Sequence, residues 1–406
     1  MNFPLFIARR ITTKSNRTFS KLIVRVAIAG IMLGLTVMIL AVAVLKGFKN
    51  EIIEKQRGFS GDIIAFQYDM NVAYDNIPIS LDDSIKANLL AIENVQSIQP
   101  FATKPGIINV NEEVEGVVLK GIDSLYNQDY LSKILVEGRG IDFSDPDGAN
   151  TQIIVSKTLA NRLKLNVGDD FLMYFVQEPI RKRKFEIVGI FNLGVEEIDK
   201  TYIIGSLALI QRLNNWDQNT VGGYEMHIAD FNALENTTSE VIDHLPIDLR
   251  GVSIVEYYPE VFKWLDLLDV NTEVILVLMV LVAVINMISA LLIMILERTS
   301  MIGILKALGF TNSGIRKIFL YNAAYLIGYG LLLGNLVGLG LCFFQSSTRL
   351  FKLDEASYYV DHVPISISVS DILLLNIGTL VICLLVLLIP SGLVSRINPV
   401  KAISFK

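Results

Sequence analysis

Few residues of this 406-residue chain have the types and spacing that catalysis or metal binding requires. The three histidines lack the spacing of metal ligands, and the two cysteines lie inside apolar runs. Gly309 and Gly314 are separated like the glycines of a phosphate-binding loop, but Ile315 stands where that motif needs lysine. We therefore expect no catalytic residue, no metal site and no cofactor bound by this chain itself.

The candidate site is instead a short polar segment, residues 297–317, that separates two apolar runs. Its apolar side chains recur at the spacing of one helix face. Ser300 can cap the start of this helix, and Gly309 can end it in a left-handed conformation. Such a helix either rests on lipid headgroups or fits its apolar face into a partner protein. The candidate residues are Glu297, Met301, Ile304, Leu305, Lys306, Ala307, Leu308 and Gly309.

Four long apolar runs must position this segment. With 52% hydrophobic and 19% charged residues, the composition fits a few membrane spans plus a large polar domain. Each run is long enough to form a helix across about 30 Å of hydrocarbon. Gly330, Gly334 and Gly338 recur at every fourth position, so they share a helix face and allow a neighbouring helix to approach closely. The predicted spans are residues 26–46, 271–296, 318–345 and 372–390.

The segments that connect these runs differ in charge. Residues 1–25 contain six basic residues and no acidic one, and segments 297–317 and 391–406 are also basic. Residues 47–270 contain 19 basic and 35 acidic residues, and segment 346–371 is also acidic. Because short basic segments stay in the cytoplasm, we expect both termini there and the 47–270 domain outside it. An isoelectric point near 5.3 argues against nucleic acid as a partner.

The external segment contains strand and helix patterns in mixed order, which predicts an α+β domain. We expect two lobes, a core lobe from residues 48–120 and 246–258 and an inserted lobe from residues 121–245. Val252–Tyr257 is predicted as the last strand. The basic run Arg181–Lys184 is either a solvated hairpin tip or a contact to anionic headgroups or to a partner.

The run Ile302–Gly309, after the second predicted span, resembles the cytoplasmic coupling segment of the FtsX/MacB-type ABC permeases. The order of one span, an external domain and three spans is also theirs. Three further segments, Gly30–Gly34, Val117–Asp123 and Asn398–Ile403, resemble the lipoprotein-releasing LolC/LolE branch of this family. The resemblance covers essentially the whole chain. It implies a MacB-like permease fold, with four transmembrane helices and a large α+β extracytoplasmic domain.

The resemblance also implies a function. The chain would be a permease subunit in the bacterial inner membrane, with its large domain in the periplasm, that extracts lipoproteins from the membrane. A LolD-like ATPase dimer would bind ATP and Mg²⁺ and receive the coupling segment in a groove, so this chain would not itself be an enzyme. The other implied partners are a second permease copy or a paralogue, the lipoprotein substrate, a LolA-like periplasmic carrier and membrane lipids. The alternatives are a MacB-like mechanotransmission exporter subunit and an FtsX-like regulator of a cell-wall hydrolase.

Overall fold

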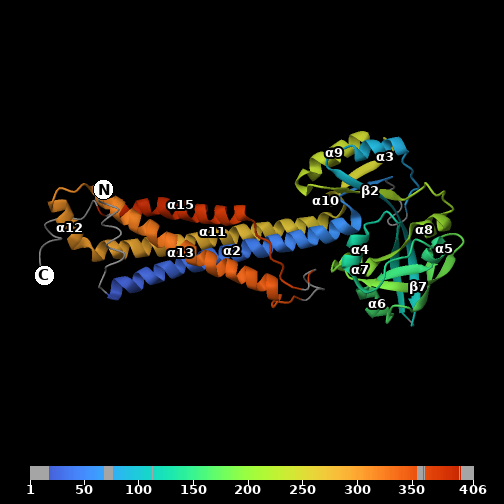
Figure 1. Ribbon diagram of the computed structural model, residues 1–406, viewed down its shortest axis with the longest axis horizontal. Helices are drawn as coiled ribbons and strands as arrows, with labels where there is room; N and C mark the ends of the chain where they lie inside the picture. The colour runs from blue at the N-terminus through green and yellow to red at the C-terminus, as the bar shows by residue number, and fades with distance from the viewer. Residues whose placement is uncertain are drawn as a thin grey trace. The chain divides into compact units, whose positions relative to one another are not determined.

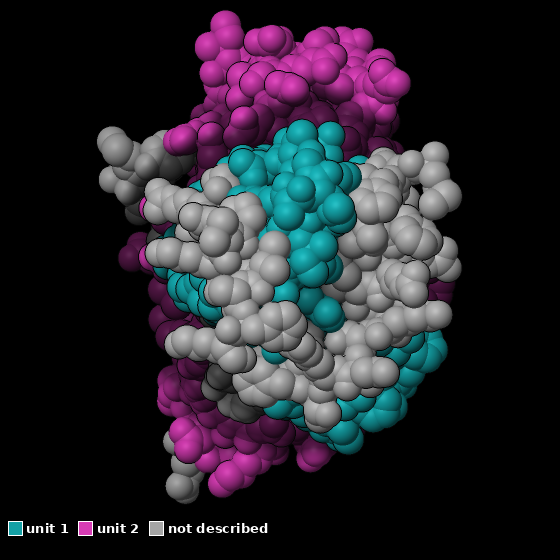
Figure 2. Space-filling model, turned by 90° about the vertical axis from the view of Figure 1, so that its left-hand side faces the viewer, with its two compact units in different colours: residues 1–50, 264–352, 362–406 teal, residues 51–263, 353–361 magenta. Residues whose placement is uncertain are grey.

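The computed structural model describes residues 18–67, 76–111, 113–353, 360, 362–392 and 394. The basic termini and the motif Asn398–Ile403 therefore fall outside the described residues, apart from the start of the first helix. The chain divides into two compact units, coloured teal and magenta in Figure 2. The helical unit comprises residues 1–50, 264–352 and 362–406, and the α/β unit comprises residues 51–263 and 353–361.

In the part of the chain that the structure describes, four helices are long and apolar enough to cross a membrane. A short helix, α12 (Thr299–Ala307), lies between the second and third of them (Figure 1). The first helix does not stop near residue 46, where we expected the span to end, but runs on to Ser60. Residues 49–57 are mostly good helix formers, so the backbone hydrogen bonding continues into the polar region. The four helices are α2 (Thr18–Ser60), α11 (Pro259–Glu297), α13 (Asn312–Thr348) and α15 (Val369–Ser391).

The glycines at every fourth position of α13 lie against α2 within the helical unit. A Cβ atom placed on Gly330 would lie 2.7 Å from the Cβ of Ile31, and one placed on Gly334 would lie 2.9 Å from the Cβ of Leu35. A Cβ atom on Gly338 would likewise lie 3.1 Å from a side-chain atom of the next turn of α2. These separations are shorter than normal carbon contacts. The missing side chains are therefore what lets the two helices approach so closely.

The α/β unit is built on a sheet with the strand order β10-β1-β9-β2-β3-β8-β5-β7-β4. Strand β6 pairs with both β2 and β7, so β2, β3, β8, β5, β7 and β6 form a closed ring. The strands are β1 (Ile63–Phe66), β2 (Val95–Val110), β3 (Glu113–Ile122), β4 (Leu135–Gly138), β5 (Gln152–Ser156), β6 (Asp170–Phe175), β7 (Arg181–Phe191), β8 (Tyr202–Ser206), β9 (Gly223–Ile228) and β10 (Arg250–Ser253).

Short helices accompany the strands, and Figure 1 shows α3 and α9 near one end of the long strand β2. Helix α9 packs on α3 and on β10. The helices of this unit are α3 (Asp83–Leu90), α4 (Gln128–Ile134), α5 (Pro146–Ala149), α6 (Lys157–Leu163), α7 (Glu196–Thr201), α8 (Leu207–Asn214), the 3-10 helix η1 (Phe231–Ala233), α9 (Leu234–His244) and α10 (Ile254–Tyr257).

Two of our expectations for this unit were wrong. Strand β9 and helix α9, which we placed in an inserted lobe ending at residue 245, belong with β1 and β10, because β9 pairs with β1 and with β2. The last strand ends at Ser253 and does not reach Tyr257. The Ser253 hydroxyl accepts a hydrogen bond from the backbone N–H of Glu256, and this cap starts helix α10.

Candidate functional site

The candidate segment forms a turn, a short helix and a second turn between α11 and α13. Helix α12 begins at Thr299, one residue before the predicted cap Ser300, and its N-terminus has no side-chain cap. The Thr299 hydroxyl instead donates to the backbone oxygen of Leu296, at 2.6 Å, because it lies within reach of the end of α11. Gly309 has a φ of +84°, the left-handed conformation that we expected after the helix. Thr311 then caps α13 by accepting a hydrogen bond from the Gly314 N–H.

The apolar residues of α12 do not form the single exposed face that the spacing indicated. Ile302 is fully buried in the core of the helical unit. Met301 and Leu305 are partly buried against the same core. Ile304 and Leu308 are exposed, at 49% and 79% of their surface. The segment therefore uses one side to pack on its own unit, and it leaves Ile304 and Leu308, one helical turn apart, open to a partner.

The end of α12 is exposed. Ala307, Leu308 and Gly309 are consecutive exposed residues, and a side chain added to Gly309 would meet no atom within 4 Å. Glu297 and Lys306 are half-buried. Lys306 lies in the last turn of α12, where a cation is favourable to the helix dipole. The segment thus presents a small apolar tip beside a positive charge, and this combination suits docking rather than catalysis.

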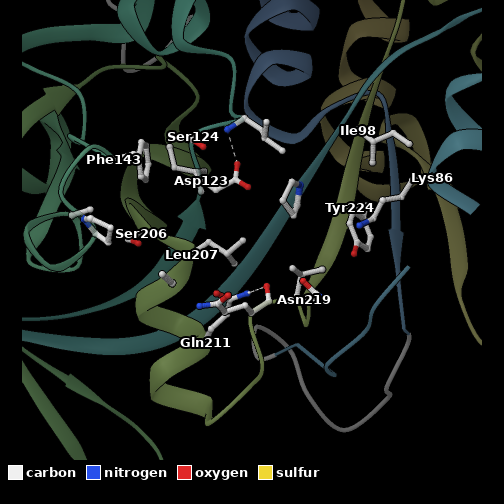
Figure 3. Close-up of a pocket in the computed structure, with 18 of the residues that line it drawn as sticks. Lys86, Ile98, Asp123, Ser124, Phe143, Ser206, Leu207, Gln211, Asn219 and Tyr224 are labelled. Atoms are coloured by element: carbon white, nitrogen blue, oxygen red, sulfur yellow. Dashed lines mark hydrogen bonds between the residues drawn. The ribbon is translucent and has the colours of Figure 1, made fainter. Parts of the chain in front are cut away.

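A cavity with a volume of about 560 Å³ lies in the α/β unit (Figure 3). Its walls come from α3, from α8, from β9 and from the end of β3. Asp123 accepts a hydrogen bond from the Leu125 N–H at 2.9 Å, and burial raises the pKa of its carboxyl group. Lys86 lies 5.6 Å from the centre of the Tyr224 ring. This lining offers apolar and amide contacts without an arrangement of nucleophile and base.

The segment Val117–Asp123 contains a buried ion pair that sequence reasoning did not predict. Lys120 Nζ lies 2.6 Å from Glu225 Oε1, and both side chains are almost completely buried. Burial lowers the pKa of Lys120 and raises that of Glu225, and the attraction between the two groups opposes both shifts. A single lysine in an apolar strand was the available signal. Its acidic partner is 105 residues away, so the pairing could not be read from the sequence.

Within the described residues, the features that an identification must explain are four helices long and apolar enough to cross a membrane, an α/β unit and an exposed apolar tip on α12. Residues 26–240 match the family described as the MacB-like periplasmic core domain, and residues 273–399 match the FtsX-like permease C-terminal family. The first match spans more than half of the chain. The chain therefore belongs to the FtsX/MacB-type family of ABC transporter permeases, and membership in this family implies an ABC ATPase as partner.

The chain is similar to named proteins from two branches of this family, the LolC/LolE proteins and MacB. The chain is 26% identical to the lipoprotein-releasing system transmembrane protein LolC of Neisseria meningitidis, with 98% of each chain covered. It is 22% identical to LolE of Haemophilus influenzae, with 100% of each covered. It is also 22% identical to the macrolide export ATP-binding/permease protein MacB of Wolinella succinogenes, over 77% of this chain but only 49% of that protein. The LolC and LolE proteins named here thus align over nearly their full length, whereas MacB aligns over only 49% of its length.

Proposed function

We propose that this chain is a permease subunit of an ABC transporter that extracts lipoproteins from the inner membrane and passes them to a periplasmic carrier. The similarity to LolC and LolE over nearly the whole chain is the observation that carries this proposal. ATP and Mg²⁺ are bound by a separate LolD-like ATPase dimer, and the chain pairs with a second copy of itself or with a paralogue. Both termini lie in the cytoplasm and the α/β unit lies in the periplasm.

The tip of α12 is the proposed contact with the ATPase. Ile304 and Leu308 are exposed apolar side chains that a groove on the partner can cover, and each covered side chain contributes favourably to binding. The opposite side of α12 carries Ile302, which is buried in the core shared with α11 and α13. A displacement of α12 by the ATPase would therefore be passed to the membrane helices by direct packing.

The helices are suited to a lipid-anchored substrate. Residues 274–296 and 372–390 contain no charged residue. Many apolar side chains of α11 and α15 are exposed in the single chain. An acyl chain is stabilised by such apolar surface and gains nothing from intramembrane charge. This supports lipid extraction over a proton or ion relay. A MacB-like exporter subunit is the second candidate, because the chain also aligns with MacB.

The test is the variant Leu308→Asp in the full complex. Leu308 is 79% exposed, so the change should leave membrane insertion and thermal stability unaltered. We expect the ATPase to be lost on co-purification and mature lipoproteins to accumulate in the inner membrane. The matched control is Leu125→Asp, the same change at a 66% exposed leucine of the α/β unit. We expect the control to behave like the native chain in both measurements.

The two readouts test different parts of the proposal. Undiminished co-purification of the ATPase with Leu308→Asp would show that α12 is not the coupling contact. If the Leu308→Asp variant loses the ATPase but lipoproteins are distributed normally, the ABC permease role would stand. The proposal that this permease releases lipoproteins would then be wrong. In that case the MacB-like exporter role would be favoured.

A further inference from the structure

The last turns of α2, residues 51–60, belong to the α/β unit and are held there by side chains from distant strands and helices. The final carbonyl groups of a helix have no partner inside the helix. In α2, two of these carbonyl groups, and a third that lies about one turn earlier, accept hydrogen bonds from buried or half-buried side chains outside the helix. Tyr130 donates to the oxygen of Lys55 at 2.8 Å, Tyr126 donates to that of Gly58 at 3.1 Å, and Lys120 donates to that of Phe59.

Lys120 is the centre of this contact. Its side chain is 3% exposed, and its ammonium group lies 4.3 Å from the centre of the Phe59 ring and 2.6 Å from the Glu225 carboxylate. Lys120 is on β3 and Glu225 is on β9, the two strands that flank β2. The ion pair therefore ties both neighbours of β2 to the end of α2. A positive charge at that end is also favourable to the helix dipole.

A second ion pair fixes the turn that follows. Gly61 leaves the helix with a φ of +71°. Asp62, which is fully buried, then accepts hydrogen bonds from Arg57 and from the Ile228 N–H, the latter at 2.8 Å. Arg57 in turn donates to the Ile228 oxygen at 3.0 Å. Two contacts thus hold the end of α2 to β9. One is made by Arg57 and Asp62 with the backbone of Ile228, and the other is the Lys120–Glu225 ion pair.

The same cluster contacts the start of α11. The hydroxyl groups of Ser60, the last residue of α2, and Tyr258, just before α11, lie 2.9 Å apart and are hydrogen-bonded. The Arg57 guanidinium lies 4.9 Å from the centre of the Phe231 ring, and that ring stacks on Phe262 in the first turn of α11. Both helices that continue into the helical unit are therefore held by one buried polar cluster.

Stability alone does not account for such a cluster. Replacing a buried ion pair by apolar residues of similar size is often neutral or stabilising. What the ion pair adds is a defined orientation of the two side chains toward each other, and therefore of the elements that carry them. We propose that Lys120 is a positioning residue that clamps the end of α2 to β3 and β9. A displacement of α2 during the transport cycle then moves the sheet of the α/β unit. This inference rests on the proposed transport function, since it assigns the clamp a role in that cycle.

The test uses the double variant Lys120→Met/Glu225→Leu in the full complex with its ATPase. This variant removes the clamp without leaving a buried charge unpaired. We expect its melting temperature and its rate of ATP hydrolysis to stay near the native values. The lipoprotein released per ATP should fall roughly tenfold, the size of a typical coupling between sites. Amide hydrogen exchange across residues 57–62 should become faster.

The matched control is Lys184→Met/Asp170→Leu, which removes an exposed ion pair of the same unit. It should change none of these quantities. Native release per ATP in the Lys120→Met/Glu225→Leu variant would overturn the proposed role of the clamp. If the native complex releases no lipoprotein, the proposed function fails, and hydrogen exchange still decides whether Lys120 holds the helix end. Unchanged exchange across residues 57–62 would then refute the clamp.

A second variant covers the case in which Lys120→Met/Glu225→Leu fails to fold. Tyr126→Phe/Tyr130→Phe keeps both rings and removes only the two hydroxyl groups that donate to α2. It should reduce release per ATP in the same direction by a smaller factor, with ATP hydrolysis retained. Native release from this variant would count against the clamp.

Discussion

The α12 segment and the polar cluster at the end of α2 use opposite kinds of contact. Ile304 and Leu308 leave α12 with an exposed apolar tip, and the other side of that helix packs through apolar side chains. The end of α2 is instead held by buried charges and hydroxyl groups, centred on Lys120 and Asp62. A surface for a separate subunit must be reachable from solvent, whereas a joint within one chain can be buried. The difference predicts that mutations at the first region damage assembly and mutations at the second damage folding or coupling.

The largest loss of stability should come from Asp62→Ala. The change leaves Arg57 without its carboxylate and the Ile228 N–H without its acceptor. Because Arg57 is about a quarter exposed, we expect the free energy of unfolding to fall by about 3 kcal/mol, at the lower end of the range for breaking a buried pair. Thermal unfolding of the full chain in detergent, monitored by loss of helical signal, measures this.

The control is Asp170→Ala, which breaks the exposed pair with Lys184. An exposed pair contributes about 0–1 kcal/mol, so this variant should unfold almost like the native chain. Equal losses of unfolding free energy in the two variants would show that the buried Arg57–Asp62 pair stabilises the fold no more than an exposed pair does. The end of α2 would then not differ from α12 in being held by buried charges.

A smaller effect should separate two isoleucines of α12. Ile302→Ala removes a fully buried side chain and should cost about 2 kcal/mol, at the lower end of the range for such a change, because the surrounding core can close part of the cavity. Ile304→Ala removes a half-exposed side chain and should cost less than about 1 kcal/mol. The affinity for the ATPase should change in the opposite order. Thermal stability and quantitative co-purification of both variants test this. A larger loss of affinity for the ATPase with Ile302→Ala than with Ile304→Ala would contradict the proposed contact through the exposed side of α12.

The parts that could be predicted from sequence are those with local signals. Hydropathy predicted four membrane helices, and the described residues form four helices of suitable length and composition. Gly309 carries the left-handed conformation that its position after a helix indicated. In both cases the relevant physics is contained in a short window of residues, namely the burial of apolar length and the backbone freedom of glycine.

The parts that sequence reasoning missed depend on pairings between distant residues. The spacing of Met301, Ile304, Leu305 and Leu308 predicted one apolar face, but which side of that face packs inward is decided by α11 and α13. The lobe boundary failed because β9 returns to pair with β1, some 160 residues earlier in the chain. The Lys120–Glu225 pair likewise joins residues that no local pattern relates. Long-range pairing is not encoded in a local period, so a single sequence does not reveal it.

The smallest predicted effect is a dependence of stability on pH that arises in the polar cluster at the end of α2. His227 on β9 is largely buried, and its Nδ1 atom lies 4.0 Å from Asp62 Oδ2. Burial lowers the pKa of His227 below 6.5, and the attraction of Asp62 opposes that shift only in part. The unfolded chain therefore binds a proton at a higher pH than the folded chain does. Stability is fully present above the unfolded pKa and decreases as the pH falls below about 6.5.

The variant His227→Gln removes this titration. Between about pH 7.5 and about pH 5.5, the native chain should lose more of its unfolding free energy than the variant, because only the native chain carries the histidine whose pKa is lowered by folding. Thermal unfolding of both proteins at the two pH values measures the difference, and every other titrating group cancels in the comparison. A native chain that loses less stability than the variant would mean that Asp62 attracts a proton to His227 more strongly than burial excludes it. The ion pair between Asp62 and the protonated histidine would then stabilise the folded state.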